Sequence, residues 1–155
     1  MKSAETVSPA QSLIRMLFLV YCGLMLWLLF GQRMEGGHLN INLDGNGENL
    51  NFVPFETVRL YWHLLQNGAS QALLRHAIVN LVGNVVMFVP LGWFLPAVWL
   101  RLRGFFKTVI FGIGVVCLVE FLQYITGLGS CDIDDLILNT VGIILGYSLW
   151  KPKHK

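Results

Sequence analysis

The chain has 155 residues, of which 55% are hydrophobic and 13% are charged. Soluble proteins usually carry about 25% charged residues, so a water-soluble globule is excluded. A disordered chain needs low hydrophobicity and a high net charge, whereas this chain has a net charge of only +2. Three cysteines are too few for a secreted disulfide scaffold. The class that remains is an integral membrane protein.

Four apolar stretches are long enough for spanning helices, which need about 20 residues each. They cover residues 13–31, 77–100, 104–126 and 133–150. The first stretch has the basic start of a signal peptide, but it exceeds the ~15 apolar residues of a signal core and no cleavage pattern follows. We therefore expect a retained anchor. Residues 1–155 are expected to form a single all-α integral membrane domain, a bundle of about four transmembrane helices.

The placement of Lys and Arg predicts the orientation, because both collect in short cytoplasmic loops. Eight of the eleven basic residues lie near the start of the first span, between the second and third, or after the fourth: Lys2, Arg15, Arg101, Arg103, Lys107, Lys151, Lys153 and Lys155. We expect a multi-pass protein of the bacterial cytoplasmic membrane with both termini cytoplasmic. Residues 32–76 and the short turn 127–132 then face outward.

The outer loop 32–76 begins with glycine-rich turn signals and continues with an apolar, aromatic segment at 58–66 (VRLYWHLLQ). This segment is too short to span a membrane. It is expected to be a short helix lying in the membrane–water interface, where aromatic residues such as Tyr61 and Trp62 are enriched. A helix packed on top of the bundle is the alternative interpretation.

Three of the four spans carry polar residues at helical spacing on one face. The stripes are Asn80 with Asn84, Glu120 with Gln123, and Asp132, Asp135 and Asn139 continuing into Gly142 and Gly146. The alternating direction of the spans places all three stripes in the outer half of the bundle, with Arg75 at its mouth. We therefore predict one polar intramembrane site that opens to the outside.

A purely structural role is the competing interpretation of these stripes. Asn and Gln side chains can join helices through hydrogen bonds worth ~0.6–2 kcal/mol each. Carboxylates such as Glu120 and Asp135 are poor glue in lipid, so we favour a functional site. The small-xxx-small pair Gly142 and Gly146 is interpreted as helix packing, and the same role is expected of Gly83.

Neither a cofactor nor a metal is predicted. Zinc signatures such as CxxC and HExxH are missing from the sequence. Glu120, Asp132 and Asp135 could hold Mg²⁺ or Ca²⁺ or do acid–base work, but both ideas have little support. The basic residues are explained by topology and anionic lipid, so nucleic acid is not an expected partner.

Five short motifs occur in an order that is more specific than any of them alone. They are NFVPF at 51–55, RHAIVNLVGN at 75–84, FVPLG at 88–92, EFLQ at 120–123 and DIDDLILNTVG at 132–142. Together they resemble the VanZ-like family of small bacterial membrane proteins. One departure is the stretch 127–131 (GLGSC), where many members carry an arginine shortly before the aspartate. Arg75 or a cation would then have to neutralise the aspartates.

The resemblance implies a multi-pass, all-helical protein. The family's namesake is associated with low-level resistance to teicoplanin that does not act through remodelling of the D-Ala-D-Ala target. An acidic site repels a bare pyrophosphate lipid and suits an amine, a cation, or a phosphate bridged by a metal or by Arg75.

Four functions are compatible with these features. We rank first a protein that binds or handles an envelope component, either an envelope lipid or a glycopeptide-related ligand. A structural or assembly partner in the bilayer follows. A cation- or proton-coupled transporter, which would be a homo-oligomer, comes third, and a small membrane enzyme comes last.

Overall fold

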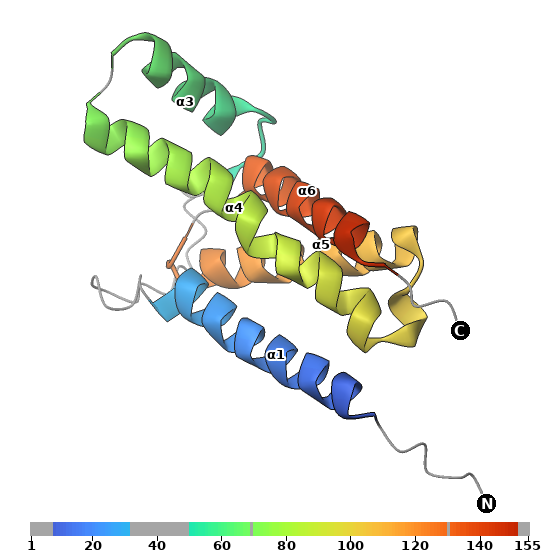
Figure 1. Cartoon of the computed structure of the whole chain (residues 1–155). Coiled ribbons are helices and arrows are strands. Elements are labelled where there is room, and N and C mark those ends of the chain that lie inside the picture. The colour runs from blue at the N-terminus through green and yellow to red at the C-terminus, as the bar shows by residue number, and fades with distance from the viewer. Residues whose placement is uncertain (1–7, 32–49, 69, 130, 152–155) are drawn as a thin grey trace, which may run out of the picture.

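The computed structural model describes residues 8–31, 50–68, 70–129 and 131–151. Figure 1 shows a helical molecule with one very short strand pair. The elements in chain order are α1 (Pro9–Leu26), η1 (Trp27–Gly31), β1 (Leu50–Asn51), α3 (Glu56–Gln66), α4 (Gln71–Val98), η2 (Leu100–Leu102), α5 (Phe105–Ile125), β2 (Cys131–Asp132) and α6 (Ile133–Leu149).

Three helical segments are long and apolar enough to cross a membrane: Pro9–Gly31, Gln71–Val98 and Phe105–Ile125. They coincide with the first three spans expected from the sequence. The fourth, α6, has 17 residues and begins with two aspartates in its first turn. That α6 also crosses the bilayer stays a prediction.

The helices begin where the sequence offers side-chain caps. Ser8 accepts a hydrogen bond from the backbone of Gln11 and completes a reciprocal capping box at α1. Ser70 caps α4 in the same way. Asp132 caps α6 by accepting a 2.8 Å hydrogen bond from the backbone N–H of Asp134. One of the acidic residues of the polar stripe therefore also starts its helix.

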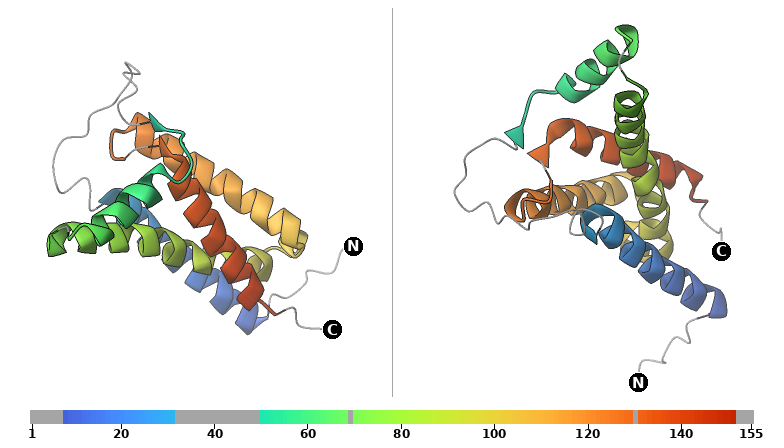
Figure 2. Two further views of the ribbon diagram at one scale, coloured as in Figure 1. Left: turned by 90° about the horizontal axis from the view of Figure 1, so that it is seen from above. Right: turned by 90° about the vertical axis from the view of Figure 1, so that its left-hand side faces the viewer.

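Helices α4 and α6 form the most extensive helix pair, and α5 packs against both of them (Figure 1). α1 contacts mainly α4, and the two views of Figure 2 show it at the edge of the molecule. The core lies where α4, α5 and α6 meet, at the fully buried Phe88, Val116 and Ile143.

Glycines let α4 and α6 approach each other closely. A Cβ on Gly142 would lie 2.2 Å from the carbonyl oxygen of Val85, and one on Gly146 would lie 1.9 Å from that of Val89. Both distances are shorter than any real contact, so only hydrogen fits there. A Cβ on Gly83 would meet no heavy atom within 4 Å, and the packing role expected of Gly83 stays a prediction.

The short helix α3 is attached to the start of α6. The Asp134 carboxylate accepts hydrogen bonds from the backbone N–H groups of Phe55 and Val58, the latter at 3.2 Å. Strands β1 and β2 pair in parallel just beside this junction. Trp62 on α3 remains 63% exposed. The bonds to α6 support a helix packed on the bundle, and the exposed indole supports a membrane interface.

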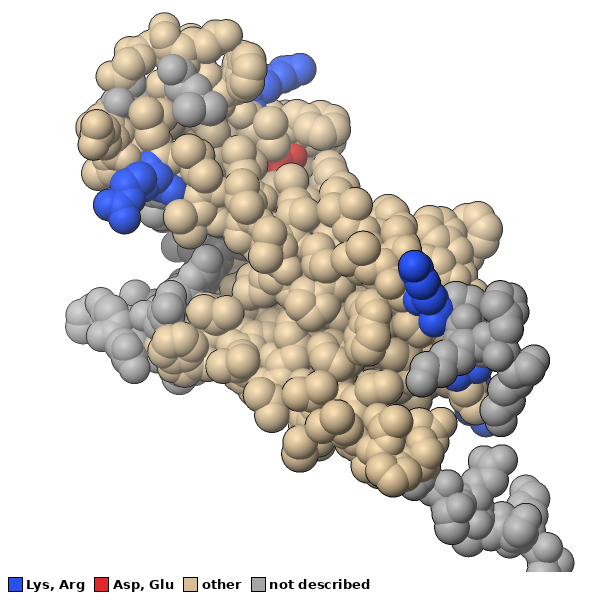
Figure 3. All heavy atoms as spheres, viewed as in Figure 1, with Lys and Arg blue, Asp and Glu red and all other residues tan. Residues whose placement is uncertain are grey.

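The middle of the molecule presents an almost uncharged surface. Figure 3 shows the Lys and Arg side chains near its ends, with a single small acidic patch on that face. In the span Pro9–Gly31 only 6% of the most apolar window is buried inside the protein. Apolar helices with so little internal contact require another apolar environment, which the hydrocarbon of a bilayer supplies.

Candidate functional site

A groove of about 930 Å³ lies between α1, α3, α4 and the start of α6, and we call it the polar groove. Its polar lining comes from four elements that are far apart in sequence. The lining residues with polar side chains are Tyr21, Thr57, Tyr61, Asn80, Asn84, Asp132 and Asp135.

Asp132 joins the groove to the segment that leads into α3. Its Oδ2 accepts a 2.7 Å hydrogen bond from the Thr57 hydroxyl, and its Oδ1 accepts a 3.4 Å bond from the Asn51 amide. The side chain also caps α6, at the positive end of that helix dipole. Asp132 is thus held by several donors at a position where it is only 8% exposed.

The two asparagines of α4 reach different neighbours. Asn84 donates a hydrogen bond through Nδ2 to Oδ1 of Asp135 on α6. Asn80, one turn earlier, donates to the hydroxyl of Tyr61 on α3 at 3.2 Å. The polar stripes of α4 and α6 therefore meet, and α3 closes over the place where they meet.

Apolar side chains form the rest of the groove. Leu24 and Met25 of α1 and Leu28 of η1 face Val79 and Val86 of α4 across it. The groove thus has an acidic, amide-lined end and apolar walls. This distribution of polar and apolar side chains suits an amphipathic molecule.

One hydrogen bond joins the α1 wall to α4. The Tyr21 hydroxyl of α1 donates to the carbonyl oxygen of Met87 at 2.8 Å, in the helical turn that precedes Pro90.

The remaining residues expected in the site lie elsewhere. Glu120 lines a second, mostly apolar pocket of about 350 Å³ together with Cys117 and Cys131, and Asp132 lines both this pocket and the groove. Gln123 donates to the carbonyl oxygen of Leu29 at 3.3 Å and so joins α5 to the end of the first span. Arg75 is exposed and does not line the groove. The single site of eight residues thus divides, and Asn80, Asn84, Asp132 and Asp135 are the four that line the groove.

Asn139 lies one turn beyond Asp135 on α6 and is 2% exposed. Its Oδ1 atom is buried and has no hydrogen-bond partner within the described part of the chain. A buried amide oxygen without a partner costs about 1–3 kcal/mol. A water molecule or a ligand group that reached this atom would recover that free energy.

Four residues of the region were not expected in the site from the sequence: Tyr21, Thr57, Tyr61 and Asp134. Thr57 and Tyr61 are four residues apart, so they share one face of the short amphipathic helix α3. That spacing is a signal which could have placed them. Asp134 is the most buried carboxylate of the described residues, at 1% exposed, yet it is off the stripe of Asp132 and Asp135. Its partners are backbone groups, which no sequence pattern reveals.

The thiol of Cys131 is not activated as a nucleophile. Burial raises the pKa of the Cys131 thiol above its ordinary 9.0, and the nearby Glu120 and Cys117 raise it further. A thiol with a raised pKa stays protonated at neutral pH and is a weak nucleophile. Among the described residues, no three His, Cys, Asp or Glu side chains are grouped to hold a metal ion.

The long apolar helices and the groove at one end of the bundle define a helical membrane protein with a partly polar internal surface. Residues 18–153 match the family model described as VanZ/LLP1, so the chain belongs to the VanZ-like family.

Protein VanZ of Enterococcus faecium is a relative that is 33% identical over 76 residues, which are 49% of this chain and 47% of that protein. The aligned part therefore spans about half the length of this curated relative. No solved structure matches the chain.

Proposed function

We propose that this protein binds an amphipathic component of the bacterial cell envelope in the polar groove, at the outer side of the cytoplasmic membrane. The observation that carries the proposal is that one groove of about 930 Å³ has both an acidic end and apolar walls. An apolar chain fits against Leu24, Leu28 and Val86, while its head group meets Asp132 and Asp135.

The charge of the groove selects the head group. Two carboxylates line the groove, and its lining includes no Lys or Arg in the part of the chain that the structure describes. Opposite charges attract strongly in a site of low polarity, whereas like charges repel. A head group that carries an amine or several hydroxyls therefore suits this end. A bare phosphate does not, since Arg75 stands outside the lining.

The proposed orientation follows from the basic residues. Arg103 and Lys151 lie together at the end of the bundle where α1 begins and α6 ends. The positive-inside rule assigns this end to the cytoplasm. The groove opens nearer the other end, toward the outer leaflet, where envelope components are displayed.

Native mass spectrometry of the gently purified protein tests the proposal. We expect a retained lipid or lipid-linked adduct in the wild type that Asp135→Asn and Asn84→Leu lose. Glu120→Gln is the matched control, because Glu120 is a buried carboxylate at a comparable position but lines a different pocket. An adduct that survives in both groove variants, or that disappears equally in the control, would refute binding in the groove.

A link to glycopeptide resistance is proposed from the relationship to Protein VanZ. The test is the minimum inhibitory concentration of teicoplanin in a susceptible bacterium that lacks an outer membrane. Expression of the wild type should raise it and expression of Asp135→Asn should not. No increase with the wild type would remove the link to resistance but would leave binding in the groove intact.

A structural role in the membrane is the second candidate. The hydrogen bonds of Asn84 to Asp135 and of Gln123 to Leu29 join neighbouring helices, which favours it. If the role is structural, the groove variants should unfold or disappear from the membrane. If the groove is a binding site, the variants should be present and folded but should carry no bound adduct. A cation- or proton-coupled transporter predicts ion flux in reconstituted vesicles under an imposed gradient.

A further inference from the structure

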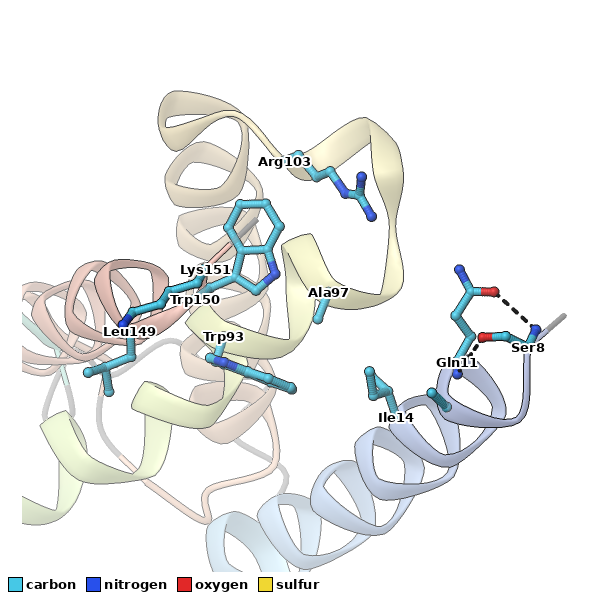
Figure 4. A pocket seen from close by; sticks show the side chains of 10 residues that line it. Ser8, Gln11, Ile14, Trp93, Ala97, Arg103, Leu149, Trp150 and Lys151 are labelled. Atoms are coloured by element: carbon cyan, nitrogen blue, oxygen red, sulfur yellow. Dashed lines mark hydrogen bonds between the residues drawn. The ribbon is translucent and has the colours of Figure 1, made fainter. Parts of the chain in front are cut away.

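A second pocket lies at the end of the bundle opposite the α3 junction. It has a volume of about 380 Å³ and lies between the start of α1, the last turns of α4, the turn after η2 and the end of α6. Figure 4 shows these four segments surrounding it. The lining residues are Ser8, Ala10, Gln11, Ile14, Trp93, Ala97, Arg103, Leu149, Trp150 and Lys151.

This pocket has the opposite charge to the polar groove. Arg103 and Lys151 line it, and its lining within the described residues includes no Asp or Glu. In Figure 4 the Arg103 guanidinium reaches toward the side where α1 begins, while the Lys151 ammonium extends past Trp150 in the other direction. Lys151 is exposed and its stem is flexible, so its charge can turn to an anion held by Arg103.

The backbone that carries Arg103 is held in place by its neighbours. The Tyr147 hydroxyl of α6 donates a 2.9 Å hydrogen bond to the carbonyl oxygen of Arg103. The buried Thr108 hydroxyl donates to the carbonyl oxygen of Leu102, one residue earlier. The Arg103 guanidinium lies 6.0 Å from the centre of the Trp150 ring. A planar cation supported in this way is prepared to bind an oxyanion with two hydrogen bonds.

The other walls of the pocket add features of a lipid site. The start of α1, capped by Ser8 and Gln11, presents the positive end of a helix dipole to the pocket. Trp93 and Trp150 are residues of the type that lies at head-group depth. Ile14, Ala97 and Leu149 supply apolar surface beside them for the first carbons of an acyl chain.

We propose that this pocket binds the phosphate of an anionic phospholipid, with Arg103 as the main ligand and Lys151 as the second. A lipid is favoured over free phosphate because tryptophan and aliphatic side chains make up six of the ten lining residues alongside the charges. Basic pockets between transmembrane helices at the cytoplasmic side are suited to such head groups. The inference is independent of the polar groove and of its ligand.

The test uses the full chain in detergent, titrated with phosphatidylglycerol or phosphatidylcholine and measured by native mass spectrometry. The wild type should retain phosphatidylglycerol in preference to phosphatidylcholine. Arg103→Gln should reduce this retention about tenfold, the effect of losing a charge-assisted bond pair. Lys151→Gln should reduce it less. Arg101→Gln is the control, because Arg101 is exposed in the same turn but does not line the pocket.

Three outcomes would overturn the proposal. Equal losses in Arg103→Gln and Arg101→Gln would mean general attraction between a basic surface and acidic lipid. Equal retention of both lipids by the wild type would mean that the pocket has no head-group preference. A third arm adds inorganic phosphate: displacement of the lipid by millimolar phosphate would show a site for the free anion and would likewise refute a lipid site. None of these results bears on the adduct expected in the polar groove.

Discussion

Asn84 of α4 donates a hydrogen bond to the carboxylate of Asp135 on α6. The two residues are separated by 51 positions in the chain. Further along α6, glycines bring the backbones of α4 and α6 into contact. The close-packed part and the polar part of this helix pair are therefore consecutive segments of one interface, and each can be tested separately.

The close-packed part should not tolerate a methyl group. Gly146→Ala places a Cβ against the carbonyl oxygen of Val89, and such overpacking costs about 1–3 kcal/mol. Thermal unfolding in detergent should show a clear loss of stability. Gly114→Ala on α5, where a Cβ meets nothing within 4 Å, is the control and should be neutral or slightly stabilising. Equal stability of both variants would contradict the close approach of α4 and α6.

The buried Asp134 should hold the start of α3. In Asp134→Asn one of the two acceptor oxygens becomes an amide nitrogen, which cannot accept from the N–H groups of Phe55 and Val58. Leaving a buried donor without its partner costs about 1–3 kcal/mol. Hydrogen exchange should then speed up in α3 while α5 keeps its protection. Glu56→Gln, an exposed change in the first turn of α3, should leave exchange unaltered. Unchanged exchange in Asp134→Asn would argue against this attachment.

Tyr21 should fix the apolar wall of the groove. Tyr21→Phe removes the hydroxyl that donates to Met87 and keeps the ring, so the loss should be about 1 kcal/mol of stability. The α1 wall should also become less firmly joined to α4, which is measurable as a wider distance distribution between spin labels on α1 and α4. Phe18→Leu, which removes a ring of the same aromatic cluster but no hydrogen bond, separates the two effects. A distribution as narrow as that of the wild type would show that the bond is dispensable.

The Cys131 thiol should report both the orientation and its raised pKa. In a Cys22→Ala, Cys117→Ala background, a membrane-impermeant maleimide should label Cys131 from the outer side of right-side-out spheroplasts. Because burial raises the thiol pKa, the thiolate fraction is small at neutral pH and grows as pH rises. The labelling rate should therefore keep increasing as the pH is raised past 9.0, the ordinary pKa of a cysteine thiol.

The matched control for this labelling is Lys151→Cys in a background without the native cysteines. Lys151 lies at the basic end of the bundle, so its replacement should react only after the membrane is opened. Labelling of this position from outside would reverse the proposed orientation. A labelling rate of Cys131 that levels off at neutral pH would contradict the raised pKa.

The sequence by itself determined the class of protein and the family. Long apolar stretches interrupted by few charges predicted helices in a membrane, because a chain of this composition has too little polar surface for water. The helical spacing of Asn80 with Asn84, and of Asp132 with Asp135, also pointed to side chains that line one groove, since spacing along a helix is a local property. The order of the short motifs was specific enough for the VanZ-like family, to which residues 18–153 belong.

Only the tertiary structure decided which of these faces meet. Glu120 has the same kind of spacing as Asp135, yet α5 turns it into another pocket, and Gln123 pairs with a backbone carbonyl of the first span. Gly83 and Gly142 look alike in sequence, but only Gly142 is pressed against a carbonyl oxygen. The rotation of each helix about its axis is set by packing against all of its neighbours at once, and no pattern within a single helix contains that information.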